Sequence, residues 1–107
     1  PKPSSAASDV YKRQMLAIAR ILRTGAQLIL LDEPTEGLAP VIVQQIGQAI
    51  RTLKERGFTI VLVEQNFRFA TKVADRHYVM EHGCVVDRLS ADEARRDPAR
   101  IARRLGV

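Results

Sequence analysis

The stretch LILLDEPTEGLAP, residues 28–40, runs from four aliphatic residues directly into two acids and a proline. A short, continuous aliphatic run is typical of a parallel strand that is covered on both faces. We therefore expect a buried strand at Leu28–Leu31. Burying an unpaired acid is costly, so Asp32 and Glu33 should emerge at the end of this strand. Ligands of parallel α/β sheets bind at that edge, which makes the two acids candidate site residues.

The sequence on either side of this stretch alternates helical and strand periodicity, which predicts an α/β layered domain with parallel strands. Ser90 and Glu93 form a predicted capping box. The expected elements, in chain order, are a helix from Met15 capped by Gly25, the strand Leu28–Leu31, a helix begun by Pro40 and ended by Gly57, a strand Phe58–Val63, a helix Phe67–Ala74, a strand His77–Met80, a tight turn at His82 and Gly83, a strand Cys84–Asp87, a helix after Ser90 and a short amphipathic helix in residues 97–107.

Composition limits the class of protein. The chain has 107 residues, 46% of them apolar and 27% charged, which suits one modest core. Its apolar runs are far shorter than the roughly 20 residues that cross a bilayer. The single Cys84 fits a reducing compartment. The net charge is +5, but the basic residues are scattered without interleaved aromatic residues, so we expect no nucleic-acid partner.

The first fourteen residues, PKPSSAASDVYKRQ, differ in character from the rest of the chain. They have no initiating methionine and no apolar core of a signal peptide. Ser4–Gln14 resembles an in-frame translation of the transposase adapter used to prepare sequencing libraries. Our hypothesis is that residues 1–14 are non-native and that the natural sequence begins at Met15, or at Gln14 by coincidence. The alternative is a disordered natural tail.

Four segments between Met15 and Val86 resemble, in order, the second half of the ATPase of ATP-binding-cassette (ABC) transporters. LILLDEPTEGLAP resembles the Walker B segment and the loop after it, and QMLAIARIL resembles the helix that follows the cassette signature. FTIVLVEQN resembles the switch strand, and ADRHYVMEHGCVV resembles the closing strand-turn-strand. The resemblance implies that residues 15–107 are the C-terminal part of an ABC ATP-binding domain, with an incomplete P-loop NTPase fold.

Finer features resemble one branch of this family. TEGLAP, VEQN and ADRHYVMEHG are similar to the ATP-binding subunits of branched-chain amino acid importers. Urea and short-chain amide importers share much of the pattern and are an alternative. Most transporter cassettes carry Thr-His-Asp at the switch, where this chain has Glu64, Gln65 and Asn66.

The resemblance also implies roles for individual residues. Asp32 would bind Mg²⁺ through water, Glu33 would be the catalytic base, and Gln65 would contact the terminal phosphate of ATP as the switch residue. The alternative is structural: the acids cap the next helix or face solvent, and Gln65 is a polar residue at a strand end. The family's loop that crosses the dimer interface is matched by Gly37, Leu38 and Ala39, although many relatives carry Asp at the last position.

The cofactors implied by the resemblance are ATP and Mg²⁺. The implied partners are a second ATP-binding subunit, two membrane-spanning permease subunits and a solute-binding protein, at the cytoplasmic face of the inner membrane. The sequence contains no phosphate-binding G-x-x-x-x-G-K-[ST] segment and no LSGGQ-type signature before Met15. We therefore expect this chain to be inactive by itself. The alternatives from other classes are a non-transport ABC ATPase of DNA repair or ribosomes and a non-catalytic basic binding module.

The family's strand order has one structural consequence. The phosphate-loop strand lies between the switch strand and the strand after it, and no such segment is present here. We expect strands Phe58–Val63 and His77–Met80 to lie roughly 9–10 Å apart, instead of about 4.8 Å, with exposed edges. Asp32 and Glu33 should keep their position at a strand end.

Overall fold

The computed structural model describes residues 5–106 and divides the chain into two units between Glu64 and Gln65. Pro1–Ser4, which belong to the predicted tail, and Val107 lie outside the described residues. The first unit contains α1 (Ser5–Arg23), β1 (Leu28–Asp32), α2 (Pro40–Glu55) and β2 (Thr59–Val63). The second unit contains α3 (Phe67–Val73), β3 (Arg76–Glu81), β4 (Cys84–Ser90), α4 (Ala91–Arg96) and α5 (Pro98–Leu105).

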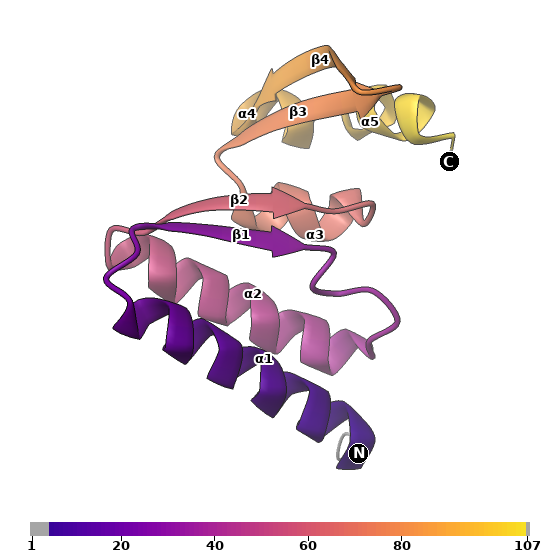
Figure 1. The fold of residues 1–107 in the computed structure, drawn as a ribbon. Helices are drawn as coiled ribbons and strands as arrows, with labels where there is room; N and C mark the ends of the chain where they lie inside the picture. The colour runs from indigo at the N-terminus through magenta and orange to yellow at the C-terminus, as the bar shows by residue number, and fades with distance from the viewer. Residues whose placement is uncertain (1–4, 107) are drawn as a thin grey trace. The chain divides into compact units, whose positions relative to one another are not determined.

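The centre of the first unit is the parallel pair of β1 and β2, which confirms the predicted parallel α/β arrangement (Figure 1). The register runs from Leu28 beside Thr59 to Asp32 beside Val63, so both strands end at the same edge. Asp32 is the last residue of β1 and Glu33 follows it directly. The predicted position of these acids at a strand end is therefore confirmed.

An apolar stripe on α2 forms the core of this unit. Buried side chains recur every three or four residues along the helix, at Ile42, Ile46, Ile50 and Leu53. Ile29 of β1 is 1% exposed and joins them in the core. Figure 1 shows α2 along the strand pair and α1 alongside α2, on the same side of the strands. The helical spacing of the apolar residues thus produces a helix that covers one face of the strand pair.

The opposite face of the strand pair is exposed, so the prediction of strands covered on both faces is wrong for the described residues. The side chains of Leu30 and Val63 are 69% and 56% exposed, and Leu28 and Val61 are also exposed. Side chains alternate between the two faces of a strand, so helices on one side can bury only every second residue. Within this unit, both helices lie on one side (Figure 1).

Helix α1 begins at Ser5, ten residues before the predicted start at Met15, and so includes the segment from Ser5 to Gln14. A disordered natural tail was the alternative interpretation of residues 1–14, and Ser5–Gln14 are helical here. The sequence from Ser5 to Arg23 contains neither proline nor glycine, the two residues that most disfavour a helix interior. A helix that forms at Met15 can therefore extend backwards. The adapter hypothesis concerns the origin of these residues and stays a prediction.

The second unit is built on an antiparallel hairpin of β3 and β4. His82 and Gly83 connect the strands with φ angles of 50° and 77°, the left-handed pair that a tight two-residue hairpin turn requires. The predicted strand-turn-strand is confirmed, and β4 continues three residues beyond the predicted end at Asp87. Its core combines strand and helix side chains: Val79, Leu89, Ala94 and Ile101.

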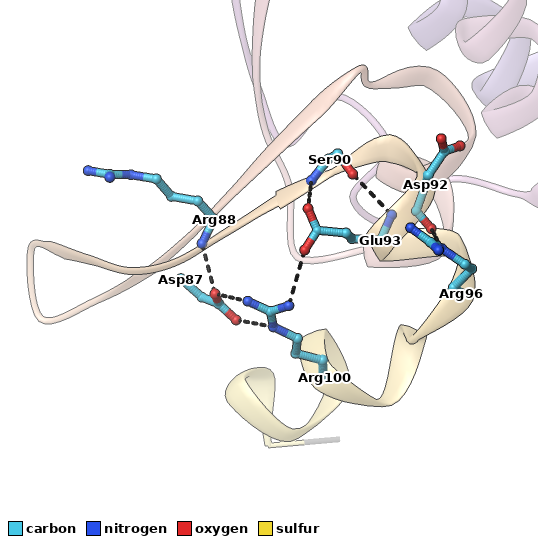
Figure 2. Close-up of polar contacts among 7 residues, drawn as sticks. All are labelled: Asp87, Arg88, Ser90, Asp92, Glu93, Arg96 and Arg100. Carbon is cyan, nitrogen blue, oxygen red and sulfur yellow. Dashed lines mark hydrogen bonds and ion pairs between the residues drawn. The ribbon is translucent and has the colours of Figure 1, made fainter.

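Polar contacts hold the terminal helices to this hairpin (Figure 2). Ser90 and Glu93 form the predicted capping box, in which each side chain accepts a bond from the other residue's backbone N–H. Arg100 of α5 donates from Nε to Asp87 Oδ2 over 2.7 Å and from Nη2 to Asp87 Oδ1. The Arg100 guanidinium thereby holds the pKa of the Asp87 carboxyl below its usual value. Arg100 also contacts Glu93, so one cation links β4, α4 and α5.

β2 and β3 belong to separate two-stranded sheets, so the switch strand and the strand after it are not hydrogen-bonded neighbours. The predicted spacing between them stays a prediction. None of the helices in residues 5–106 combines the length and the apolar character that crossing a bilayer would need.

The alternation of buried and exposed side chains along β1 can be tested by substituting two adjacent residues. Ile29→Ala should destabilise the chain by about 2–5 kcal/mol, because it leaves a cavity in the core. Leu30→Ala removes the same kind of side chain from the exposed face and should change the free energy of unfolding by less than about 0.5 kcal/mol. Urea unfolding followed by circular dichroism measures both. Equal effects of the two substitutions would contradict the one-sided burial of β1.

Candidate functional site

The candidate site lies where β1 and β2 end together. Asp32 is exposed at the end of β1, beside Val63 of β2. The backbone N–H of Glu33 donates to the carbonyl of Val63 over 2.7 Å, which extends the strand pairing by one bond. The half-buried Glu64 follows Val63 directly. Parallel pairing therefore brings three carboxylates, from two segments about 30 residues apart in sequence, to one edge of the first unit.

A tight turn follows β1 and directs the chain toward α2. Glu33 has a φ angle of 46°, in the left-handed region that non-glycine residues rarely adopt. The N–H of Glu36 donates to the carbonyl of Glu33 over 3.2 Å, and the N–H of Leu38 donates to the carbonyl of Thr35 over 3.2 Å. The unusual φ angle turns the Glu33 backbone out of the strand direction. Asp32 therefore has the extended backbone of a strand, whereas Glu33, the next residue, has a left-handed backbone.

One side-chain bond connects this turn to the end of β2. Thr35 Oγ1 donates to Glu64 Oε2 over 2.8 Å, and the Thr35 residue is only 5% exposed. Burying a hydroxyl is unfavourable unless it is hydrogen-bonded, and this bond satisfies its donor. A bond to an ionised carboxylate is stronger than one between neutral groups. The turn after β1 is therefore anchored to the residue just before Gln65.

The acids of this edge change one another's ionisation. The negative charge of Glu36 raises the pKa of the Glu33 carboxyl above its usual value, and partial burial adds to the shift. A side-chain hydrogen bond with Glu36 and the charges of Asp32 and Glu64 raise it further. Crowded carboxylates resist simultaneous ionisation, because each negative charge disfavours the next. Glu33 is consequently a stronger proton acceptor than an isolated glutamate.

The donor set at this edge suits Mg²⁺ only in part. No group of three or more histidine, cysteine or acidic side chains among residues 5–106 is arranged to hold a metal ion. Mg²⁺, however, commonly binds through one or two carboxylates together with water and phosphate oxygens. The exposed carboxylate of Asp32 fits that kind of site. The predicted role of Asp32 as a magnesium ligand through water therefore stays compatible with the geometry and stays a prediction.

The predicted dimer loop lies between the turn and α2. Gly37 is exposed with a φ angle of 71°, and Leu38 is half-buried. Ala39 is the N-cap residue of α2, in an extended conformation, and Pro40 occupies the first helical turn. No side chain caps this helix end, because alanine offers no acceptor. The loop therefore leads straight from the acidic turn into the helix that carries the core.

The predicted switch residue Gln65 is exposed and lies two residues after the end of β2. It is the first residue of the second unit. The next residue, Asn66, caps α3, since its Oδ1 accepts from the N–H of Phe69 over 3.1 Å. Gln65 thus lies between Glu64, which is bonded to the turn after β1, and Asn66, which caps α3.

Sequence reasoning identified Asp32, Glu33 and Gln65, and it did not identify Thr35, Glu36 or Glu64 as parts of the site. The chain contains several threonines and many acids, so residue type alone does not single these three out. A short distance in sequence from the end of a predicted strand could have marked Thr35 and Glu64 as site residues. Thr35 and Glu64 lie three residues and one residue after paired strands, where loops of a parallel sheet meet.

No family model matches the chain. The high-affinity branched-chain amino acid transport ATP-binding protein BraG of Pseudomonas aeruginosa is 53% identical over 75 residues, which are 70% of this chain and 32% of BraG. The arginine transport ATP-binding protein ArtM of Bacillus subtilis is 40% identical over 76 residues, covering 71% of this chain and 32% of ArtM. The chain spans about a third of the length of these curated relatives.

Solved structures show the same fold. MJ1267, an ATP-binding cassette of an ABC transporter, aligns with a TM-score of 0.78 over 91% of this chain and 39% of its own. The sequences are 23% identical in this alignment, so the likeness concerns the fold. The described residues therefore have part of the fold of an ABC ATPase, with one small parallel and one small antiparallel sheet.

The repulsion between Glu33 and Glu36 generates a prediction about titration. Glu36→Gln should lower the pKa of the Glu33 carboxyl, because Glu36 is the largest cause of the upward shift. A raised pKa in the folded state means stability that is present at low pH and declines as pH rises through the titration of Glu33. Glu36→Gln should weaken this decline.

Carbon-13 NMR of the glutamate carboxyls, titrated from low to neutral pH, measures the shift. Asp92→Asn is the control, since Asp92 lies on α4 and is not among the groups that shift Glu33. A pKa of Glu33 unchanged by Glu36→Gln, or lowered equally by Asp92→Asn, would contradict the proposed repulsion.

The uncapped start of α2 generates a second prediction. Ala39→Asn should stabilise the chain by about 1 kcal/mol, because its side-chain oxygen can accept from the backbone N–H of Val41 in the first helical turn, whereas the N–H groups of Ile42 and Val43 already donate to the Ala39 carbonyl. Ala39→Leu introduces a side chain similar in size to asparagine but without a hydrogen-bond acceptor, so it should give no such gain in stability. Chemical denaturation of both variants measures the difference. The same stability in both would show that Ala39 does not occupy a cap position.

Proposed function

Because the chain belongs to the family of ATP-binding subunits of ABC transporters, we propose that it is part of a subunit whose ATP hydrolysis powers the import of branched-chain amino acids. The 53% identity to BraG over 75 residues is the observation that carries this proposal. The urea and short-chain amide importers remain the second candidate, because their sequence pattern is closely similar. The choice of solute belongs to partner proteins and is tested through them.

In this proposal, Glu33 accepts a proton from the water that attacks the terminal phosphate. The charges of Glu36, Asp32 and Glu64 support this role, since they raise the pKa of Glu33 toward the operating pH. Mg²⁺, when bound with ATP, neutralises charge on the phosphates. Asp32 would hold that ion through water, as an exposed carboxylate at the end of β1.

Gln65 would sense the terminal phosphate as the switch residue. An amide both donates and accepts hydrogen bonds, and it carries no charge that titrates near neutral pH. We therefore expect its contact with phosphate to depend less on pH than that of the histidine found in most transporter cassettes. Gly37, Leu38 and Ala39 would face a second ATP-binding subunit across the dimer interface. Ala39 offers no polar group to that contact.

The exposed apolar face of the first unit supports a larger parent domain. Leu28, Leu30, Val61 and Val63 form this face on the two strands. Exposed apolar patches of this kind usually mark an interaction surface. We infer that the parent covers this face and supplies the phosphate loop and the signature segment. The parent would act as a dimer at the cytoplasmic face of the inner membrane, with two permease subunits and a solute-binding protein.

The proposal can be tested with a chimera in which the matching segment of P. aeruginosa BraG is replaced by that of this chain. With its transporter partners, the chimera should hydrolyse ATP in the presence of Mg²⁺ and support uptake of branched-chain amino acids. Glu33→Gln in the chimera should lower kcat by about 100-fold or more while ATP binding is retained. The 107-residue chain alone should show no ATPase activity.

Three outcomes would contradict the proposal. Hydrolysis at the unchanged rate in the Glu33→Gln chimera would remove the assigned base. Uptake of urea or amides, but not of branched-chain amino acids, with the corresponding partners would favour the second candidate. ATP hydrolysis by the isolated chain would show that it contains a complete site.

A further inference from the structure

Thr35 is unusual among the described residues because it is the one polar residue counted in the buried core. Its hydroxyl donates to Glu64 Oε2 over 2.8 Å. Leaving a buried hydroxyl without a partner costs about 1–3 kcal/mol, so the bond determines where the turn can sit. The two residues are 29 positions apart in sequence, which makes this a tertiary contact between two loops.

Each end of this bond adjoins a residue with an assigned role. Thr35 lies two residues after Glu33 and two residues before Gly37. Glu64 lies directly before Gln65. A second link, from the Glu33 N–H to the Val63 carbonyl, joins the same two loops at 2.7 Å. The turn after β1 is thus attached to the end of β2 at two points.

The Glu33 backbone depends on such attachment. Its φ angle of 46° is unfavourable for a residue with a side chain, and such conformations persist where the surroundings determine them. The Glu36 N–H bond to the Glu33 carbonyl, at 3.2 Å, closes the turn locally but does not tie it to β2. The Thr35 bond supplies a side-chain tie between this turn and the second strand.

We propose that Thr35 and Glu64 form a positioning pair that holds the turn carrying Glu33 in register with the segment carrying Gln65. The pair touches no reacting atom and acts through its neighbours. This inference rests on the proposed function, since it assigns Glu33 and Gln65 to one reaction. It ties the turn that carries Glu33 and leads into Gly37–Ala39 to Glu64, the residue directly before Gln65.

The first test measures the full 107-residue chain by NMR and needs no ATP. Thr35→Val keeps the shape and removes the donor, so the amides of Glu36 and Leu38 should exchange at least about tenfold faster. Thr35→Ser keeps the hydroxyl and should preserve slow exchange. The amides of Ile46 and Ile50 in α2 report whether the first unit remains folded.

A second variant covers the case in which Thr35→Val unfolds the unit. Glu64→Gln keeps an acceptor oxygen for the Thr35 hydroxyl, so the turn amides should stay protected. Glu64→Met removes the acceptor and leaves Thr35 unchanged, so the same amides should exchange faster. Unchanged exchange in Thr35→Val or in Glu64→Met would overturn the pair.

The chimera then separates positioning from simple support of the fold. Thr35→Val should lower kcat by about tenfold or more with KM for ATP changed by less than about twofold, because a misplaced base affects the chemical step. Thr35→Ser should restore kcat. An unchanged kcat in Thr35→Val would overturn the positioning role. If the chimera with all side chains intact fails to hydrolyse ATP, the proposed function is wrong, and the exchange measurement still decides whether the pair holds the turn.

Discussion

The parallel pairing of β1 with β2 is the constraint on which the candidate site depends. Parallel strands point the same way, so their carboxyl ends lie at one edge, and here Asp32 pairs with Val63 at that edge. The pairing is held from one side by the apolar stripe of α2, in which Ile42 and Ile46 are buried with Ile29 of β1. The positions of the acids therefore depend on an aliphatic core that includes none of the acidic residues.

The acidic edge combines features that are unfavourable for stability and suitable for proton transfer. Glu33 has a left-handed backbone and lies close to other negative charges, which raise the pKa of its carboxyl. Such a group is destabilising when ionised, and it is also a better base than an isolated glutamate. Local strain that persists at a functional position is expected where neighbouring contacts hold it, and the bond between Thr35 and Glu64 lies in the same turn as Glu33.

The second unit is stabilised in a different way. Its hairpin and short helices bury few side chains, and the charged contacts of Arg100 with Asp87 and Glu93 link three elements (Figure 2). Asp87 is mostly buried at its side chain, with 15% exposed, so this pair is better shielded from solvent than the other ion pairs of the unit. The capping box at Ser90 begins α4 directly after β4. Local sequence features thus carry much of the organisation of this part of the chain.

The sequence by itself determined the local features: the order of helices and strands, the hairpin turn at His82 and Gly83, the capping box and the place of Asp32 and Glu33 after a strand. These follow from apolar spacing, φ preferences and caps, which act over a few neighbouring residues. It misjudged the start of α1 and the covering of the strands, because a helix can extend into a neutral segment and burial depends on which elements pack together. Only the tertiary structure decided that Thr35 is buried against Glu64, 29 residues away, and that the charge of Glu64 adds to the raised pKa of Glu33. Those contacts exist because parallel pairing brings two distant loops to one edge, and no local pattern encodes that distance.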